Sequence, residues 1–173
     1  MRTLVAIIAV ASSLALAQQS EEPSFEQFKV KTIFHGAPAA AMPKTIKALQ
    51  FRTVIRNGAK KGPNFAGHYT VVVWGCGTSC ASLAIVDAMS GRVFDAPFSG
   101  ITWSDGRGPF TEEGLEFKVD SALLVAKGCP EETDCAARYY RWNGQHLTLL
   151  LKRPLKRLYQ YWPPEGDEEP PRN

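Results

Sequence analysis

Short apolar runs rich in β-branched residues, separated by glycine-rich or polar turns, occupy most of the chain between residues 68 and 151. Runs of this length and composition are typical of strands rather than helices. Asn143-Gly144 lies between the last two runs and is a strong signal of a β-hairpin turn. The sequence therefore predicts an antiparallel meander of about six or seven strands. The runs cover residues 68–74, 80–87, 92–98, 115–119, 123–127, 136–142 and 145–151.

The run at 68–74 is apolar at both odd and even positions. Strands covered on both faces have this pattern, so we expect a central strand here. Residues 99–110 are rich in glycine and predict a long loop.

Two segments predict helices around this sheet. Residues 44–61 have apolar side chains at helical spacing but also alternate locally as a strand does; the basic end at 59–62 favours a helix. Leu151, Leu155, Leu158 and Trp162 also follow helical spacing and predict a short C-terminal helix. The predicted fold class is α+β and mainly β, with one N-terminal and one short C-terminal helix.

The N-terminus has the pattern of a cleaved signal peptide over residues 1–17. Arg2 precedes a short apolar stretch, and Ala15-Leu16-Ala17 has the small-residue spacing of a signal peptidase site. The stretch is too short for a transmembrane helix, and no later segment approaches that length, so we expect no membrane span after cleavage. The mature protein is expected to be exported, either periplasmic or secreted.

The remaining chain fits one domain of ordinary size. We expect a flexible lead-in with a first strand at 30–34 within residues 18–43, a single β-rich domain over residues 44–162, and a disordered tail over residues 163–173. The signal carries one arginine and no acid, so the mature net charge is one lower than the +3 of the full chain. Such a weak charge does not predict nucleic-acid binding.

Four cysteines, at positions 76, 80, 129 and 135, bear most directly on function. In an oxidising compartment an even number of cysteines indicates disulfides. Three pairings are open, and the short spacings favour Cys76–Cys80 and Cys129–Cys135. Zinc would need closer spacing in the second pair, and dithiol exchange sites usually place two residues between their cysteines. We therefore expect neither a metal nor another cofactor.

A nucleophilic Cys76 is the main alternative to a structural disulfide. His68 is the nearest histidine in sequence, but eight residues of straight strand would separate the two by roughly 26 Å. A thiolate–imidazole pair needs about 3 Å. A cysteine-dependent hydrolase or thiol enzyme would thus need His35 or His146, and the sequence favours a protein that is not an enzyme.

Short disulfide rings stiffen the turns that they close, and a stiff exposed turn loses little entropy on binding. Gly77, Thr78 and Ser79 lie inside the first ring and are the predicted binding residues. The predicted function is an exported binding or inhibitor-like module for a protein or cell-envelope component. The oligomeric state stays open.

The string "GPNFAGHY…WGCGTSC" within residues 62–80 resembles a motif of small exported bacterial proteins, with the likeness extending from about residue 44 to Asn143-Gly144. Residues 69–86 are also similar to the strand, Cys-loop-Cys, strand arrangement of the periplasmic inhibitors of vertebrate lysozyme. That resemblance implies a disulfide-closed loop, bounded by Cys76 and Cys80, that enters an enzyme cleft. Here the loop is one residue shorter and lacks that family's histidine and acid, so the likeness concerns loop architecture only.

Overall fold

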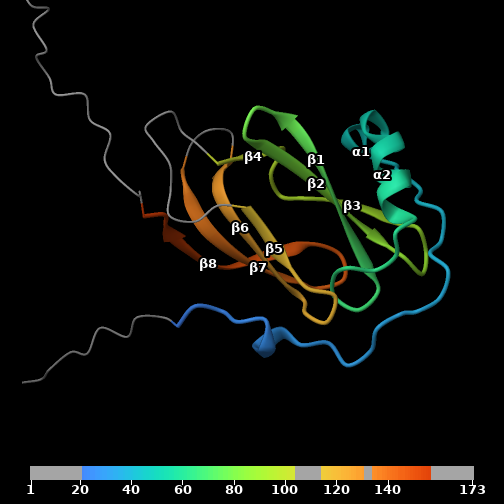
Figure 1. Ribbon diagram of the computed structural model, residues 1–173, viewed down its shortest axis with the longest axis horizontal. Coiled ribbons are helices and arrows are strands. Elements are labelled where there is room, and N and C mark those ends of the chain that lie inside the picture. The colour runs from blue at the N-terminus through green and yellow to red at the C-terminus, as the bar shows by residue number, and fades with distance from the viewer. Residues whose placement is uncertain (1–20, 104–113, 131–133, 157–173) are drawn as a thin grey trace, which may run out of the picture.

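The computed structural model describes residues 21–103, 114–130 and 134–156 (Figure 1). Within these ranges the chain forms an eight-stranded sheet in the order β1-β2-β4-β6-β7-β8, with β3 paired to β2 and β5 paired to β6. Every strand pair is antiparallel, which confirms the mainly β, antiparallel prediction. The strands are β1 (Tyr69–Gly77), β2 (Cys80–Asp87), β3 (Val93–Asp95), β4 (Ile101–Thr102), β5 (Gly114–Phe117), β6 (Leu123–Pro130), β7 (Ala136–Trp142) and β8 (Leu147–Pro154).

The sheet folds over on itself into two layers that enclose the main core. β1, β2 and β3 form one layer, β5 to β8 form the other, and the short β4 joins β2 to β6. Side chains at alternate positions of both layers meet between them, because successive strand residues point to opposite faces. The principal buried members of this cluster are Phe65, Tyr69, Val71, Leu83, Ile85, Ile101, Leu124, Ala126, Tyr140 and Trp142.

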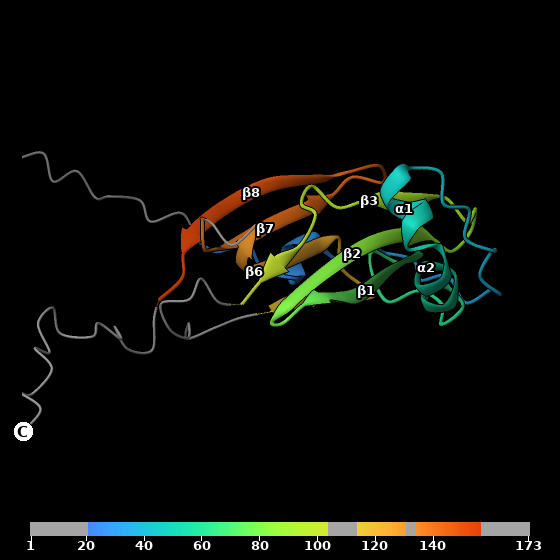
Figure 2. The ribbon, with the colours of Figure 1, turned by 90° about the horizontal axis from the view of Figure 1, so that it is seen from above.

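The helices cover the outer face of the β1–β2 layer (Figures 1 and 2). α1 (Ile46–Gln50) begins after Thr45, whose hydroxyl accepts a hydrogen bond from the Ala48 amide at 3.1 Å. α2 (Arg52–Ala59) follows after Phe51, whose backbone leaves the helical conformation and whose ring lies 4.9 Å from that of Trp74. The helical interpretation of residues 44–61 is therefore confirmed, with one helix divided into two.

This helical layer explains why the run at 68–74 has apolar residues at both odd and even positions. Val71 faces the main core, whereas Val72 and Trp74 face α1 and α2. The expected coverage on both faces is present, but the expected central position is wrong, because β1 lies at one end of the strand order.

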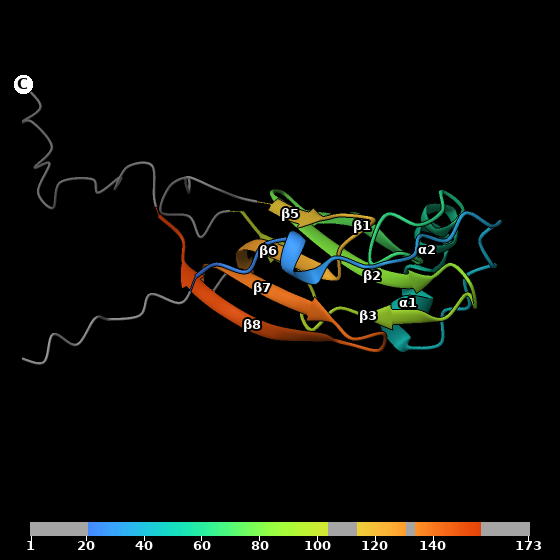
Figure 3. The same cartoon turned by 90° about the horizontal axis from the view of Figure 1, so that it is seen from below.

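The N-terminal segment covers the outer face of the other layer. The 3-10 helix η1 (Glu26–Phe28) lies against β6 and β7 (Figure 3), and Phe25 and Phe28 pack on the cluster formed by Leu123, Val125, Ala137 and Tyr139. The predicted strand at 30–34 is absent, because this stretch crosses the turn before β6 with single contacts: the Val30 amide bonds to the Asp120 carbonyl and the Phe34 amide to the Gly67 carbonyl. Residues 21–43 thus pack on the domain instead of preceding it freely.

Two further predictions need correction. The loop expected at 99–110 contains β4, whose two residues are too few to leave a pattern in the sequence. The expected C-terminal helix is wrong over residues 151–154, which belong to β8, where Pro154 is tolerated at the end of an edge strand. The rest of that predicted helix, the predicted signal peptide and the predicted C-terminal tail lie outside the described residues.

Candidate functional site

The turn between β1 and β2 is the first part of the candidate site. Gly77 pairs with Cys80, so Thr78 and Ser79 form a two-residue turn, and a disulfide joins Cys76 to Cys80 across it. Residues 75 to 79 are exposed. The hairpin extends past the helical layer, as the two perpendicular views show (Figures 1 and 2).

Local contacts hold this turn in one conformation. Gly77 has φ of +143° and Ser79 φ of +51°, and the first of these angles favours glycine. The Trp103 amide donates a hydrogen bond to the Ser79 carbonyl at 2.9 Å. A Cβ atom added to Gly100 would lie 3.0 Å from the Cys76 sulfur and 3.1 Å from the Cys80 sulfur, so a larger residue there would have to push the disulfide back by a few tenths of an ångström.

The second disulfide, Cys129–Cys135, closes the connection between β6 and β7. Both predicted pairings are therefore present, and the described residues contain no free cysteine. Thr102 of β4 pairs with Cys80 on one side and with Cys129 on the other. Since neighbouring strands lie about 4.8 Å apart, Cys80 and Cys129 are separated by only about 10 Å. The two disulfide-closed turns thus share one end of the molecule, and we call this end the cystine end.

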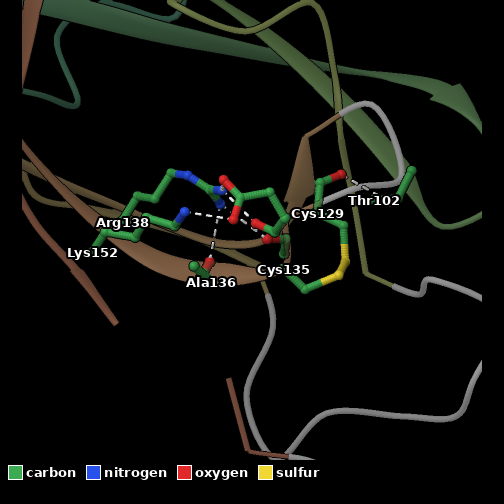
Figure 4. A network of polar contacts seen from close by, with 8 residues as sticks. Thr102, Cys129, Cys135, Ala136, Arg138 and Lys152 are labelled. Atoms are coloured by element: carbon green, nitrogen blue, oxygen red, sulfur yellow. Dashed lines mark hydrogen bonds and ion pairs between the residues drawn. A yellow bond between two sulfur atoms is a disulfide. The ribbon is translucent and has the colours of Figure 1, made fainter. Parts of the chain in front are cut away.

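A buried arginine braces the second turn (Figure 4). Arg138 of β7 is 6% exposed, and its guanidinium donates to the carbonyls of Gly128 and Ala136 at 3.2 and 3.4 Å and to the carbonyl of Asp134. It also pairs with the Asp134 carboxylate at 2.9 Å, and Lys152 of β8 contacts the same carboxylate. From the neighbouring strand β4, the Thr102 hydroxyl donates a hydrogen bond to the Cys129 carbonyl at 3.0 Å.

Arg138 and Lys152 determine the electrostatic environment of Asp134. The hydrogen bond from Lys152, and then that from Arg138, lowers the pKa of the Asp134 carboxyl below its ordinary value, although partial desolvation opposes the shift. Asp134 is therefore ionised at neutral pH and neutralises part of the charge on Arg138. Asp134 also has a φ of +52°, in the left-handed region that residues other than glycine seldom adopt.

The histidines lie at the opposite end of the strands. His68 precedes β1 and is 3.9 Å from the Asp87 carboxylate; His35 follows Phe34, which bonds to Gly67; and His146 contacts Asn143 in the β7–β8 turn. Cys76 closes the other end of β1, and its sulfur is held in the disulfide. A thiolate at Cys76 would thus require reduction first, and no described histidine is placed to activate it.

Sequence reasoning named the cysteines and the residues 77–79, but it missed the groups that position them. Thr102 and Gly100 have no sequence signal, because their roles depend on pairing between strands distant in the chain. Arg138 shares the run 136–142 with a second cation, Arg141, so the sequence alone does not show which of the two is buried and paired.

Other kinds of site find little support among the described residues. No three His, Cys, Asp or Glu side chains of the described ranges gather as metal ligands. No helix in those ranges is long and apolar enough to cross a membrane. A surface pocket of about 440 Å³ lies between residues 38–41 and α2, on the helical layer rather than at the cystine end.

The cystine end consists of the two disulfide-closed turns, the strand β4 that joins them, and the cations Arg138 and Lys152 that contact Asp134. The disulfides are compatible with an exported protein. Comparisons of the chain with protein-family models, curated proteins and solved structures found no match.

Proposed function

We propose that this protein is an exported, non-enzymatic binding module whose cystine end contacts a protein or cell-envelope partner in the periplasm or outside the cell. The observation that supports this most directly is the register across β4, which brings the two disulfide-closed turns side by side. Two disulfide-closed connections at one end of the sandwich provide a larger contact area than either one alone.

The chemistry of the first turn suits recognition by shape and hydrogen bonding. Thr78 and Ser79 offer hydroxyl groups, Gly77 leaves its backbone accessible, and none of the three carries a charge. Since the disulfide already restricts this turn, less conformational entropy is lost when a partner binds. A narrow, closed hairpin tip fits a concave partner, which agrees with the resemblance to the loop of periplasmic lysozyme inhibitors. Because that family's histidine and acid are missing, we propose the same mode of binding with a different target.

Site-specific cross-linking tests this proposal. A photoreactive amino acid at position 78, introduced into the protein expressed in its native host, should give a discrete cross-linked product. The matched control places the same group at Thr148, an exposed threonine of β8 away from the cystine end. Thr78→Arg in the unlabelled protein should abolish competition for the product, while Thr148→Arg should compete as the wild type does.

Two outcomes would contradict the proposal. Equal cross-linking from positions 78 and 148 would mean that the tip is not a specific contact. Alkylation of Cys76 in the native, unreduced protein would favour a thiol enzyme instead, because the disulfide in the structure leaves no thiol there.

A further inference from the structure

The outer edge of β1 is paired along only half of its length. The amide of Tyr69 donates to the Phe65 carbonyl at 2.9 Å, and the Tyr69 carbonyl accepts from the amides of Asn64 and Phe65 at 3.0 Å. At Val71, two residues beyond Tyr69, the side chain of Asn64 makes the hydrogen bonds that a neighbouring strand would otherwise make. Its carbonyl oxygen accepts from the Val71 amide at 2.7 Å, and its amide nitrogen donates to the Val71 carbonyl at 3.0 Å.

Beyond Val71 the edge is open. In an antiparallel pair, backbone groups of alternate residues point away from the partner strand, so Val73 and Gly75 present their amide and carbonyl groups to the same side as Tyr69 and Val71. No described residue bonds to these groups. Val73 is 41% exposed, in contrast to the buried Val71 and Val72. An unpaired strand edge is a template on which another extended chain can pair.

A groove runs along this edge beside α2. It has a volume of about 380 Å³, and Val54, Asn57, Gly58, Lys61, Thr70 and Val73 are among its lining residues. An extended peptide paired with an edge strand next to a helix needs such a space for its side chains.

The charge of this region indicates what kind of peptide fits. Residues 27–86 contain eight lysines and arginines and no aspartate or glutamate. On α2 and directly after it, Arg56, Lys60 and Lys61 are exposed, and no acid of the described residues lies within ion-pair distance of them. Lys61 lines the groove itself, and Arg56 and Lys60 lie on the adjacent surface of α2.

We propose that the β1 edge at Val73 and Gly75, together with the groove beside α2, binds an acidic extended peptide segment of a partner protein as an added strand. The peptide backbone pairs with the free amide and carbonyl groups of Val73 and Gly75, and its carboxylates face Lys61 and the neighbouring cations. A second copy of this chain is a poorer occupant, since its own α2 would bring like charges together. This site is independent of the proposed binding at Thr78 and Ser79.

Titration of the isotope-labelled full mature chain with synthetic peptides tests the site. The probe is an acetylated peptide of about ten residues in which glutamates alternate with valines and threonines; its counterpart carries lysine in place of each glutamate. The glutamate peptide should shift the amide resonances of Val73 and Gly75 and slow their hydrogen exchange. The lysine peptide should leave both unchanged.

Two pairs of variants separate the backbone contact from the charge. Val73→Pro removes an amide that points away from β2, so the sheet is retained and peptide affinity should fall about fivefold or more, the equivalent of one hydrogen bond. Val73→Thr keeps that amide and should bind as the wild type does. Lys61→Glu should weaken binding of the glutamate peptide about two- to fivefold, whereas Arg141→Glu, an equal change of charge at an exposed position of β7, should not.

Any of three results would overturn the inference: equal binding of the two peptides, equal losses in Lys61→Glu and Arg141→Glu, or no shift at Val73 and Gly75 up to about 1 mM peptide. A dimer in light scattering whose interface protects the Val73 amide would assign the edge to a second copy instead. Thr78 serves as the control for the cystine end. The glutamate peptide should leave the amide resonance of Thr78 unchanged, so binding at the β1 edge is measured separately from binding at the cystine end.

Discussion

Arg138 is a buried cation whose partners are mostly backbone carbonyls. The guanidinium donates hydrogen bonds to the carbonyls of the buried Gly128 and Ala136, and it also pairs with the exposed Asp134. Replacement by Met would fill much of the volume but leave these carbonyls without a donor. Arg138→Met should therefore lower the free energy of unfolding by about 2–4 kcal/mol, as measured by urea denaturation. Arg141→Met, on the exposed side of the same strand, should change it by less than about 0.5 kcal/mol; similar losses in the two variants would mean that the carbonyls find other donors.

Asp134 gives the stability of the cystine end a defined pH dependence. Because Lys152 and Arg138 lower its pKa in the folded protein, the folded state binds this proton less readily than the unfolded chain does. The stabilisation by Asp134 is therefore complete above its unfolded pKa of about 3.9, and is lost as the pH falls through the lower folded pKa. Wild type should exceed Asp134→Asn in unfolding free energy at neutral pH, and the difference should shrink as the pH falls below that unfolded value. A difference that stays constant with pH would contradict this role.

At the scale of elements, the sequence predicted those strands that have a full apolar run. β2 and β7 match the expected residues, because each has a buried face along its whole length. β4 was missed, since two residues carry no period. The C-terminal helix prediction is wrong over residues 151–154, because this segment is extended in β8, and Leu151, together with Leu155 just after the strand, packs on the outer cluster of β6 and β7.

The two cystine turns should differ in their effect on stability. Each closes a ring of few residues, for which loop entropy gives roughly 2 kcal/mol. Cys76 is exposed, whereas Cys129 is fully buried. The second disulfide also lies next to Asp134, which forms an ion pair with Arg138. Cys76→Ser with Cys80→Ser should thus cost roughly 2 kcal/mol, and Cys129→Ser with Cys135→Ser about 1–3 kcal/mol more, because a polar hydroxyl would be buried. Urea denaturation of both double variants measures these two losses of unfolding free energy. A larger loss in the variant without the Cys76–Cys80 disulfide would contradict the prediction.

At the scale of the whole molecule, the described residues form four layers: α1 and α2, the layer of β1 to β3, the layer of β5 to β8, and the N-terminal segment. The register across β4 creates the cystine end, and the sequence could predict each disulfide but not their proximity. The short separation between the two cysteines of each pair predicts each disulfide. The connection of β2 to β6 through β4, in contrast, depends on contacts between distant parts of the chain.

The outermost layer yields the last prediction. Phe25 and Phe28 cover Leu123 and Tyr139, while the Ser121 hydroxyl bonds to the Phe25 carbonyl and the Ala122 amide to the Phe28 carbonyl, both at 2.8 Å. A segment held this way is part of the folding unit, so Phe25→Ala with Phe28→Ala should lower the unfolding free energy by about 2–4 kcal/mol, the value of two partly buried aromatic side chains. Glu26→Ala with Lys29→Ala removes only an exposed ion pair and should change it by less than about 1 kcal/mol. If both double variants unfold at the wild-type urea concentration, the N-terminal segment is an appendage, and the stability of the sandwich comes from its two inner clusters alone.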